Sequence, residues 1–491
     1  MKLVKSLLLG SAAGLIAVGG AQAADLPVKA KAVEYVKICS LYGAGFYYMP
    51  GTDTCIKFGG YVRADYWGTG GDYGFMSSTL PNSNQGSNNR LTNYWGTRAR
   101  MDLTVDTRTA TEYGVVRTFA DMVFSFDTQQ ANVQSGGASL GLYHAFVQFA
   151  GFTFGRTVSI FDMPWTGYPA GGPDTIPGGS NHVTGINQAA YTADFGQGIT
   201  GSLAIEEPTT GANGQAYLFN TSTFTTANFI NGLYGTNSWG GTRAPDLLAQ
   251  VRVDQAWGLF QFGVVAHDIH PAYYTPGFET AGHPGDTWGW AAQVGLSIKN
   301  IPTGAGDSLN LQAVYADGDI HAVFGNIAWP QNWSMYSGSG IGAYQSIGFA
   351  SLADGVFGTG TSVEKTKSWG FRGGFTHNWS PNWASGVYGG YAQVKYGTNG
   401  TALICANFAA IALPGATCNP DFNVAVVGVN TVWTPVKNLA FTADVSWTHL
   451  DQKYSGTIAA PAQAGFAKPA AVYELKDQNS VSMLLRAQRN F

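Results

Sequence analysis

The carboxyl-terminal segment Gln478–Phe491 restricts the possible folds of this chain more than any other stretch. Its residues alternate between an apolar and a polar face, and a period of two is typical of a β-strand with one apolar and one wetted side. The apolar face is formed by Val481, Met483, Leu485, Ala487 and Phe491, and the polar face by Ser480, Ser482, Arg486, Gln488 and Asn490. In a closed membrane barrel the last strand pairs with the first, and an interfacial aromatic residue such as Phe491 marks its end. The alternative is an edge strand of a soluble sandwich.

The first 23 residues have the layout of a secretory signal peptide. Lys2 and Lys5 give a positive start, Leu7–Val18 an apolar centre, and Ala21–Ala23 a small-residue cleavage site. No later stretch has the roughly 18 uninterrupted apolar residues of a membrane helix. We therefore divide the chain into a signal peptide, residues 1–23, and one exported β-barrel domain, residues 24–491.

The composition is typical of a chain that faces lipid. Charged residues make up 11% of the sequence, whereas a typical soluble protein has about 25%. The chain carries 26 basic and 30 acidic side chains, and loss of the two signal-peptide lysines takes the formal net charge from −4 to −6. An acidic chain argues against binding to nucleic acid, which requires basic patches.

The strands recur along the whole chain. Most of the alternating segments have close to the 9–11 residues that a tilted membrane strand needs. The predicted strands are Ile56–Trp67, Tyr94–Val105, Gly114–Asp127, Gly141–Phe149, Phe152–Arg156, Gln188–Asp194, Ile199–Glu206, Leu247–Asp254, Leu259–Asp268, Thr287–Lys299, Ser308–Asp317, Ser368–Trp379, Trp383–Tyr396, Phe422–Thr434, Leu439–Leu450 and Gln478–Phe491. Short turns, one of them expected at Asp106–Thr109, alternate with long loops such as Glu207–Pro245 and Gly318–Thr366. This pattern predicts an all-β, antiparallel transmembrane barrel of about 16 strands with periplasmic turns and external loops. A barrel of 18 strands is the alternative.

Aromatic residues gather at the predicted strand ends, as expected for the two interfacial girdles of a membrane barrel. They are Tyr66, Trp67, Tyr94, Trp95, Trp257, Trp288, Trp290, Trp369, Trp379, Trp383, Trp433 and Trp447. The core of a soluble sandwich would instead place such residues in the middle of the strands.

The four cysteines are an even number in an exported chain, which favours disulfides. The barrel interpretation places Cys39 and Cys55 more than about 25 Å from Cys405 and Cys418. Bonded cysteines need Cα atoms within roughly 7 Å. We therefore expect Cys39–Cys55 and Cys405–Cys418, each contributing on the order of 3 kcal/mol in the chain-entropy model. Free thiols are the alternative.

Several stretches resemble the alphaproteobacterial porin family. They are Val36–Cys39, Tyr42–Tyr48, Pro50–Lys57, Gly59–Arg63, Arg98–Arg100, Phe146–Arg156 and the terminal Phe491. The resemblance runs from the signal peptide to the terminus. It implies a sixteen-stranded outer-membrane barrel, usually trimeric, that passes small hydrophilic solutes.

Motifs for catalysis or cofactor binding lack their structural context. Gly137–Gly141 fits the serine nucleophile elbow, but no helix is expected after it. Gly338–Ala343 fits a dinucleotide pattern, but no βαβ unit surrounds it. Asp317–Asp319 is more typical of a turn than of a calcium loop, and the eight histidines show no metal-ligand spacing. The sequence therefore predicts no catalytic residue, metal site or cofactor.

Five arginines are expected on one inner wall of the barrel. Arg63, Arg98, Arg100 and Arg117 lie on the polar faces of the first three strands, and Arg486 on that of the last. Closure makes these four strands neighbours. Stacked guanidinium groups would be costly in the core of a soluble sandwich, whereas a water-filled lumen removes most of that cost.

The long connection Thr157–Asn187 follows the fifth strand and is too apolar for a freely exposed loop. Ile160, Phe161, Met163, Trp165, Tyr168 and Ile176 would be buried if it folded inward against the barrel wall. We therefore predict an inward-folded third loop that narrows the pore, as in general porins. Its carboxylates, Asp162 and Asp174, are the candidates for the acidic side of a constriction opposite the arginines.

Three functions are weighed. The first is an outer-membrane porin, a water-filled channel for passive diffusion of small hydrophilic solutes and ions. The second is a sugar-specific channel, which needs stepped aromatic residues along the lumen; Tyr61 alone is no such track. The third is an outer-membrane enzyme, for which no Ser/His or Asp/His constellation is visible. The expected partners are outer-membrane lipid and lipopolysaccharide, the barrel-assembly machinery and two further copies of the chain in a homotrimer, without cofactor or nucleic acid.

Overall fold

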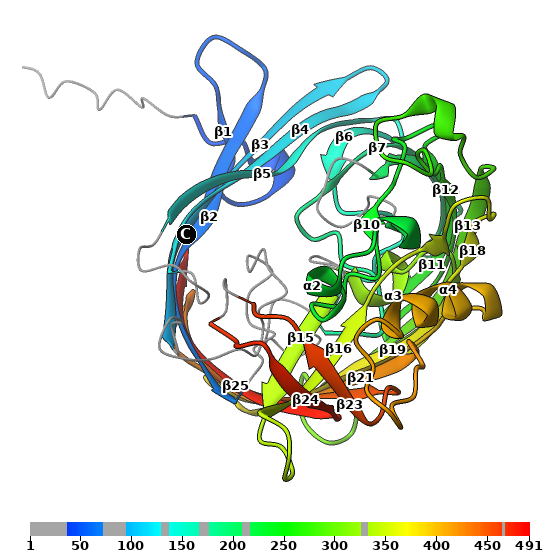
Figure 1. Ribbon diagram of the computed structural model, residues 1–491. Helices are drawn as coiled ribbons and strands as arrows, with labels where there is room; N and C mark the ends of the chain where they lie inside the picture. Colours follow the sequence, from blue (N-terminus) through cyan, green and yellow to red (C-terminus); the bar gives the residue numbers. More distant parts are fainter. Residues whose placement is uncertain are drawn as a thin grey trace, which may run out of the picture.

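The computed structural model describes residues 37–71, 95–128, 137–165, 176–208, 217–325, 332–463 and 467–491. Sixteen of its strands form a closed antiparallel barrel, seen along its axis in Figure 1, and the two-residue strand β1 (Tyr47–Tyr48) adds to the start of β2. The barrel strands are β2 (Cys55–Gly71), β3 (Trp95–Thr111), β4 (Gly114–Asp127), β5 (Gly137–Phe149), β6 (Phe152–Thr157), β7 (Ile186–Asp194), β8 (Ile199–Glu207), β11 (Asp246–Gln255), β12 (Gly258–Ile269), β13 (Thr287–Lys299), β14 (Ser308–Asp317), β19 (Lys367–Ser380), β20 (Trp383–Lys395), β21 (Phe422–Val436), β22 (Leu439–Gln452) and β25 (Gln478–Asn490). The sixteen predicted strands are confirmed, one for one.

The barrel closes between its first and last strands, as predicted. β25 pairs with β22 on one side and with β2 on the other, in a register that runs from Tyr61 opposite Asn490 to Gly71 opposite Ser480. The backbone N–H of Phe491 continues this ladder by donating to the carbonyl of Gly60 at 3.1 Å. Closure leaves the long strands without a free edge, which is what makes such a sheet compatible with lipid.

The alternation of faces read from β25 is confirmed. Ser480 and Ser482 are 2% exposed on the inner side, whereas Val481 and Met483 are 44% and 39% exposed on the outer side. In a barrel, successive side chains along each strand must point alternately into the lumen and toward the lipid. A polar residue that is buried here is therefore packed inside the barrel.

Ten of the twelve aromatic residues expected in the girdles are exposed. The exposed members are Tyr66, Trp95, Trp257, Trp288, Trp290, Trp369, Trp379, Trp383, Trp433 and Trp447. Trp67 is a correction, since it is 3% exposed and packs against Leu484 inside the barrel. It directly follows the outward-facing Tyr66, so alternation turns it inward. Tyr94 lies outside the described residues.

The turn expected at Asp106–Thr109 is wrong. β3 continues through it to Thr111, and the turn falls at residues 112–113. Pairing on both sides overrides the local turn propensity, because Thr107 pairs with Ile56 of β2 and with Thr118 of β4. The hairpin at residues 150–151 is as expected: Ala150 and Gly151 both have positive φ, +48° and +86°, as a type I′ turn requires.

Both expected disulfides are present. Cys39–Cys55 has a Cα–Cα distance of 6.0 Å and fastens the segment before the barrel to the start of β2. Cys405–Cys418 has a Cα–Cα distance of 5.6 Å and links α4 (Thr398–Phe408) to the rest of the loop between β20 and β21. The two bonds lie at opposite ends of the barrel, because β2 begins at the end with the short turns and the β20–β21 loop belongs to the other end.

The described parts of the long loops are folded and cover part of the barrel interior (Figure 1). They contain two four-stranded sheets and the short helices α2 (Thr226–Phe229) and α3 (His321–Phe324). The sheets consist of β9 (Leu218–Asn220), β10 (Thr236–Asn237), β17 (Gly355–Phe357) and β18 (Glu364–Lys365), and of β15 (Asn332–Ser337), β16 (Gln345–Ser351), β23 (Thr457–Ala460) and β24 (Ala471–Leu475). Their buried residues, such as Phe229, Phe349 and Tyr454, form one apolar core with inward residues of the barrel wall such as Val394 and Val424. Within the described residues, no helix has the length and apolar character to cross a membrane.

Candidate functional site

The five predicted arginines lie on the inner wall formed by β25, β2, β3 and β4, which we call the charged wall. The strand register places Arg63 opposite Arg100, and Asp65 opposite both Arg98 and Arg486. Arg117 on β4 is opposite Arg108 of β3. Alternation and closure therefore bring four of the arginines together, whereas Arg117 lies eight residues further along β4, nearer the short β3–β4 turn.

The wall is not simply basic, because carboxylates alternate with the guanidinium groups. Asp65 accepts from Arg486 at 2.7 Å and lies 3.1 Å from Arg63, and Asp127 accepts from Arg98 at 2.8 Å. Asp106 pairs with Arg117 at 3.0 Å and with Arg108 at 2.9 Å. Like charges directly opposite on neighbouring strands repel, and interleaved carboxylates remove that repulsion. The carboxylates occupy inward positions in the same period-two pattern as the arginines. The sequence alone could therefore have predicted that the wall carries both charges.

The arginines differ in their access to the lumen. Arg63 and Arg98 are only 7% and 4% exposed, whereas Arg100, Arg117 and Arg486 are half-buried. Arg100 donates to the hydroxyl of Ser125 at 2.8 Å and forms no salt bridge within the described residues. Arg100 is therefore the member of the set whose charge is least neutralised by a direct partner.

The third loop (L3) spans residues 158–185, and its described parts, 158–165 and 176–185, fold inward as predicted and lie against the opposite wall. Side-chain amides from three adjacent strands donate to its carbonyls: Gln250 to Ile160 at 2.6 Å, Gln261 to Asp162 at 2.9 Å, and Gln293 to Phe161. Phe161 and Met163 are 3% and 1% exposed. These strands, β11, β12 and β13, are half the ring away from β2 and β3.

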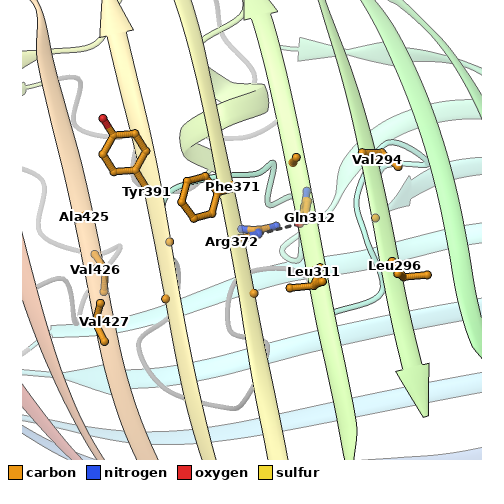
Figure 2. A pocket seen from close by; sticks show the side chains of 15 residues that line it. Val294, Leu296, Leu311, Gln312, Phe371, Arg372, Tyr391, Ala425, Val426 and Val427 are labelled. Atoms are coloured by element: carbon orange, nitrogen blue, oxygen red, sulfur yellow. Dashed lines mark hydrogen bonds between the residues drawn. The ribbon is translucent and has the colours of Figure 1, made fainter. Parts of the chain in front are cut away.

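A buried arginine that the sequence analysis did not select, Arg372, fastens the far end of L3. Figure 2 shows this side chain pointing toward Gln312. Arg372 on β19 is 1% exposed and donates to the carbonyl of Ser180 at 2.7 Å and to Gln312 Oε1 at 2.8 Å. L3 approaches this wall so closely that a Cβ on Gly178 would lie 2.3 Å from the carbonyl oxygen of Phe371. Arg372 has the inward alternation of its strand, but its partners are backbone groups of a loop that sequence spacing does not locate.

The structure buries Asp162 instead of placing it at the expected constriction. Its side chain is 0% exposed and accepts from Nδ1 of His182 at 3.0 Å and from the His182 backbone N–H. Burial alone would raise the pKa of Asp162, but the neighbouring His182 lowers it below its usual value. The carboxylate therefore holds two parts of L3 together and is not available to a passing ion. Asp174 lies outside the described residues.

The outer side of the same wall carries an apolar hollow of about 620 Å³ (Figure 2). Gly373 and Gly389 form part of its lining, beside Leu311, Phe371 and Val427. The last three residues are about half exposed and face outward. The hollow is therefore separate from the lumen, although Arg372 and Gln312 border it from within.

Comparison with known proteins agrees with this architecture. A sequence model described as the porin subfamily matches residues 25–484. The chain belongs to this porin family. Porin Omp2b of Brucella abortus is 32% identical over 346 residues, which cover 66% of this chain and 88% of that protein. The same porin of Brucella melitensis has the same identity and coverage. The outer membrane channel DcaP of Acinetobacter baumannii shares the fold, with a TM-score of 0.57, 16% identity, and coverage of 90% of this chain and 99% of that one.

This porin is therefore an outer-membrane, multi-pass β-barrel that forms a channel for passive diffusion. The catalytic motifs considered from sequence are not formed. Ser139 lies within strand β5 rather than in a strand–turn–helix elbow, and Gly338–Ala343 connects β15 to β16.

Proposed function

We propose that small hydrophilic solutes and ions pass along the charged wall, and that its half-buried arginines set a weak ion preference. The observation that carries this proposal is the asymmetry of the interior. On the opposite side L3 covers the inward amides, and Gln261, Gln293 and Gln312 are at most 3% exposed. The partly exposed charges of Arg100, Arg117 and Arg486 lie on the other side.

The preference should be weak because the charges nearly balance. Carboxylates lie beside most of the arginines, and water screens the remaining field over a Debye length of about 8 Å at physiological salt. A low-dielectric wall still focuses the field, so the local charge biases the ions that enter. The expected bias fades as ionic strength rises.

Reversal potentials in planar bilayers under a salt gradient test this proposal. Joint replacement of Arg100 and Arg117 by Gln should shift the preference toward cations at low salt, with little change at high salt. Arg252→Gln is the matched control, since this arginine pairs with Asp254 at 3.1 Å next to a short turn, away from the charged wall. An unchanged reversal potential in the double variant would remove these arginines from the conduction path.

A sugar-specific channel is the second candidate, since several rings face inward on the charged wall. Phe119 and Phe146 stack with centroids 5.4 Å apart, and Tyr143 lies nearby on β5. Guanidinium groups cover these rings, with Arg117 5.1 Å from the Phe119 centroid and Arg100 5.8 Å from that of Tyr143. Rings covered in this way leave less of their faces free for a sugar, which favours general diffusion over a sugar-specific channel. Concentration-dependent block of the ion current by an oligosaccharide would favour the sugar channel instead.

The remaining assignments extend the family resemblance. We infer export by a signal peptide that ends at Ala23, no enzymatic activity, and a homotrimer in contact with lipid and lipopolysaccharide that the barrel-assembly machinery inserts. Residues 1–36 lie outside the described part of the chain. Mass spectrometry of the mature protein, both intact under native conditions and at its amino terminus, tests the trimer and the cleavage site together.

A further inference from the structure

A cluster of buried titratable residues lies where the loop 318–366 (L6) meets L3 and the barrel wall. It surrounds a small cavity of about 30 Å³, whose lining includes His182, Glu206, Asp246, His267, Asp319 and His321. A cavity needs roughly 10–15 Å³ of such space to hold one water molecule, so this one admits a single small ion with a water. The conduction path proposed above does not use this cluster.

Three of the buried side chains converge. Asp319, His321 and Asp354 each offer a ligand atom, and these atoms all lie within 4.8 Å of one another. Backbone N–H groups fix both carboxylates: Asp354 accepts from Ile320 and from Tyr217, each at 2.6 Å, and Asp319 accepts from Ala322 at 3.2 Å. Neither carboxylate forms an ion pair with a lysine or arginine among the described residues.

His321 supplies an independent reason to expect a ligand. Its side chain is 3% exposed, and neither ring nitrogen has a hydrogen-bond partner within the described part of the chain. Its ring stacks on Tyr217 with centroids 5.7 Å apart and a tilt of 20°. One ring nitrogen lies within 4.8 Å of a carboxylate oxygen of Asp319 and of Asp354, and His321 also lines the cavity. A buried imidazole is normally hydrogen-bonded or coordinated.

His267 on β12 lines the same cavity, and its hydrogen bonding is typical of histidines near bound metal ions. Its Nδ1 lies 2.9 Å from Asp246, and its Nε2 has no hydrogen-bond partner in the described residues. A carboxylate that holds one imidazole nitrogen and leaves the other available is the usual outer-shell arrangement around bound metal ions. The second histidine pair, His182 with Asp162, closes the other side of the cavity.

We propose that Asp319, His321 and Asp354 bind a divalent transition-metal ion, with Zn²⁺ as the best match. Imidazole nitrogen combined with carboxylate oxygen suits zinc, whereas calcium and magnesium take oxygen ligands almost alone. A 2+ charge balances the two carboxylates. In a tetrahedral site with bonds of about 2.1 Å the donor atoms lie about 3.4 Å apart, so binding draws the three side chains slightly together.

Such an ion would link the start of L6 to a later part of the same loop. Asp319 and His321 lie just after β14, and Asp354 lies between β16 and β17. Sequence spacing did not indicate the site because Asp354 is far from Asp319 and His321 in the chain. The calcium-loop pattern considered from sequence is not formed, since Asp317 points to Lys365, at 3.4 Å, rather than to the cluster.

Calorimetric titration of the folded, chelator-treated porin with Zn²⁺ tests the site, using protein without a histidine tag. We expect one Zn²⁺ per chain, and an absorption-edge spectrum of the wild-type complex with imidazole and carboxylate donors. His321→Gln should weaken binding by at least about tenfold, since even outer-shell changes cost about 10–100-fold. The control is His270→Gln, because His270 is a partly exposed loop histidine that pairs with Asp286.

Heat-modifiable mobility shows whether each variant has folded. If His321→Gln does not fold, Asp319→Asn carries the test, because Asn retains an oxygen that can accept from the Ala322 N–H. The proposal is overturned if wild-type porin binds no stoichiometric Zn²⁺, if it binds Ca²⁺ but not Zn²⁺, or if the folded ligand variants bind as tightly as the His270 control.

Discussion

Replacement of Arg372 by Met should loosen L3 from the barrel wall. Met matches the arginine side chain only as far as Nε, and it has no N–H donor to offer. The replacement leaves Ser180 O and Gln312 Oε1 without the guanidinium that they now contact at 2.7 and 2.8 Å. Gln312 in turn donates to Gln293 at 2.6 Å, and Gln293 donates to the carbonyl of Phe161, so the loss reaches both ends of L3.

The size of the effect follows from these contacts. A hydrogen bond to a charged group contributes about 1.5–3 kcal/mol, so the two short bonds amount to roughly 3–6 kcal/mol. Removing the guanidinium also removes its desolvation cost, which places the net loss near the lower end, at about 3 kcal/mol. Since 1.4 kcal/mol is a factor of ten, the undocked population of L3 should rise by roughly a hundredfold.

Hydrogen exchange followed by mass spectrometry measures this directly. The amides of Gly178 and Gly179 donate to the carbonyl of Val323, each at 2.9 Å, so peptides covering them report the docking of L3. Arg252→Met is the control, because it removes a partly exposed ion pair and should change stability by less than about 0.5 kcal/mol. Equal protection of these amides in Arg372→Met and in the control would refute the anchoring role.

Three further predictions concern assembly, covalent bonding and pH. Deletion of Phe491, or its change to a charged residue, should reduce the yield of heat-modifiable barrel while secretion continues, because the closing strand loses its interfacial end; a normal yield would contradict this. Reduction of Cys405–Cys418 should lower the free energy of unfolding of its loop by on the order of 3 kcal/mol. Peptide mapping without reductant should find this pair, and free thiols in the map would contradict the prediction. Burial alone would lower the pKa of His182, but Asp162 outweighs it and raises the pKa to about 9. This stabilisation is complete below the unfolded value near 6.5 and is lost as pH rises through about 9, so exchange in L3, corrected for intrinsic rate, should accelerate there in wild type and not in His182→Gln.

The chain determined the barrel through local alternation. Period-two patterns located sixteen strands and assigned Arg63, Arg100 and Arg486 to the inner side. The assignment of faces is strict, because shifting a strand by one residue would turn all its lipid-facing side chains inward. The apolar content of L3 was also enough to predict that it folds inward. Such inferences succeed because each depends on neighbouring residues and on the requirement that a sheet in lipid must close.

Tertiary structure decided how the polar groups are paired. Only the register between strands shows that Asp65 lies between Arg63 and Arg486, so that the wall is mixed rather than basic. Only the docking of L3 shows that Asp162 is buried against His182, and that Arg372 holds the loop. The electrostatic energy of a charge depends on what lies within a few ångströms of it. Those neighbours come from segments far apart in the chain, whereas alternation along a strand is already present in the order of its residues.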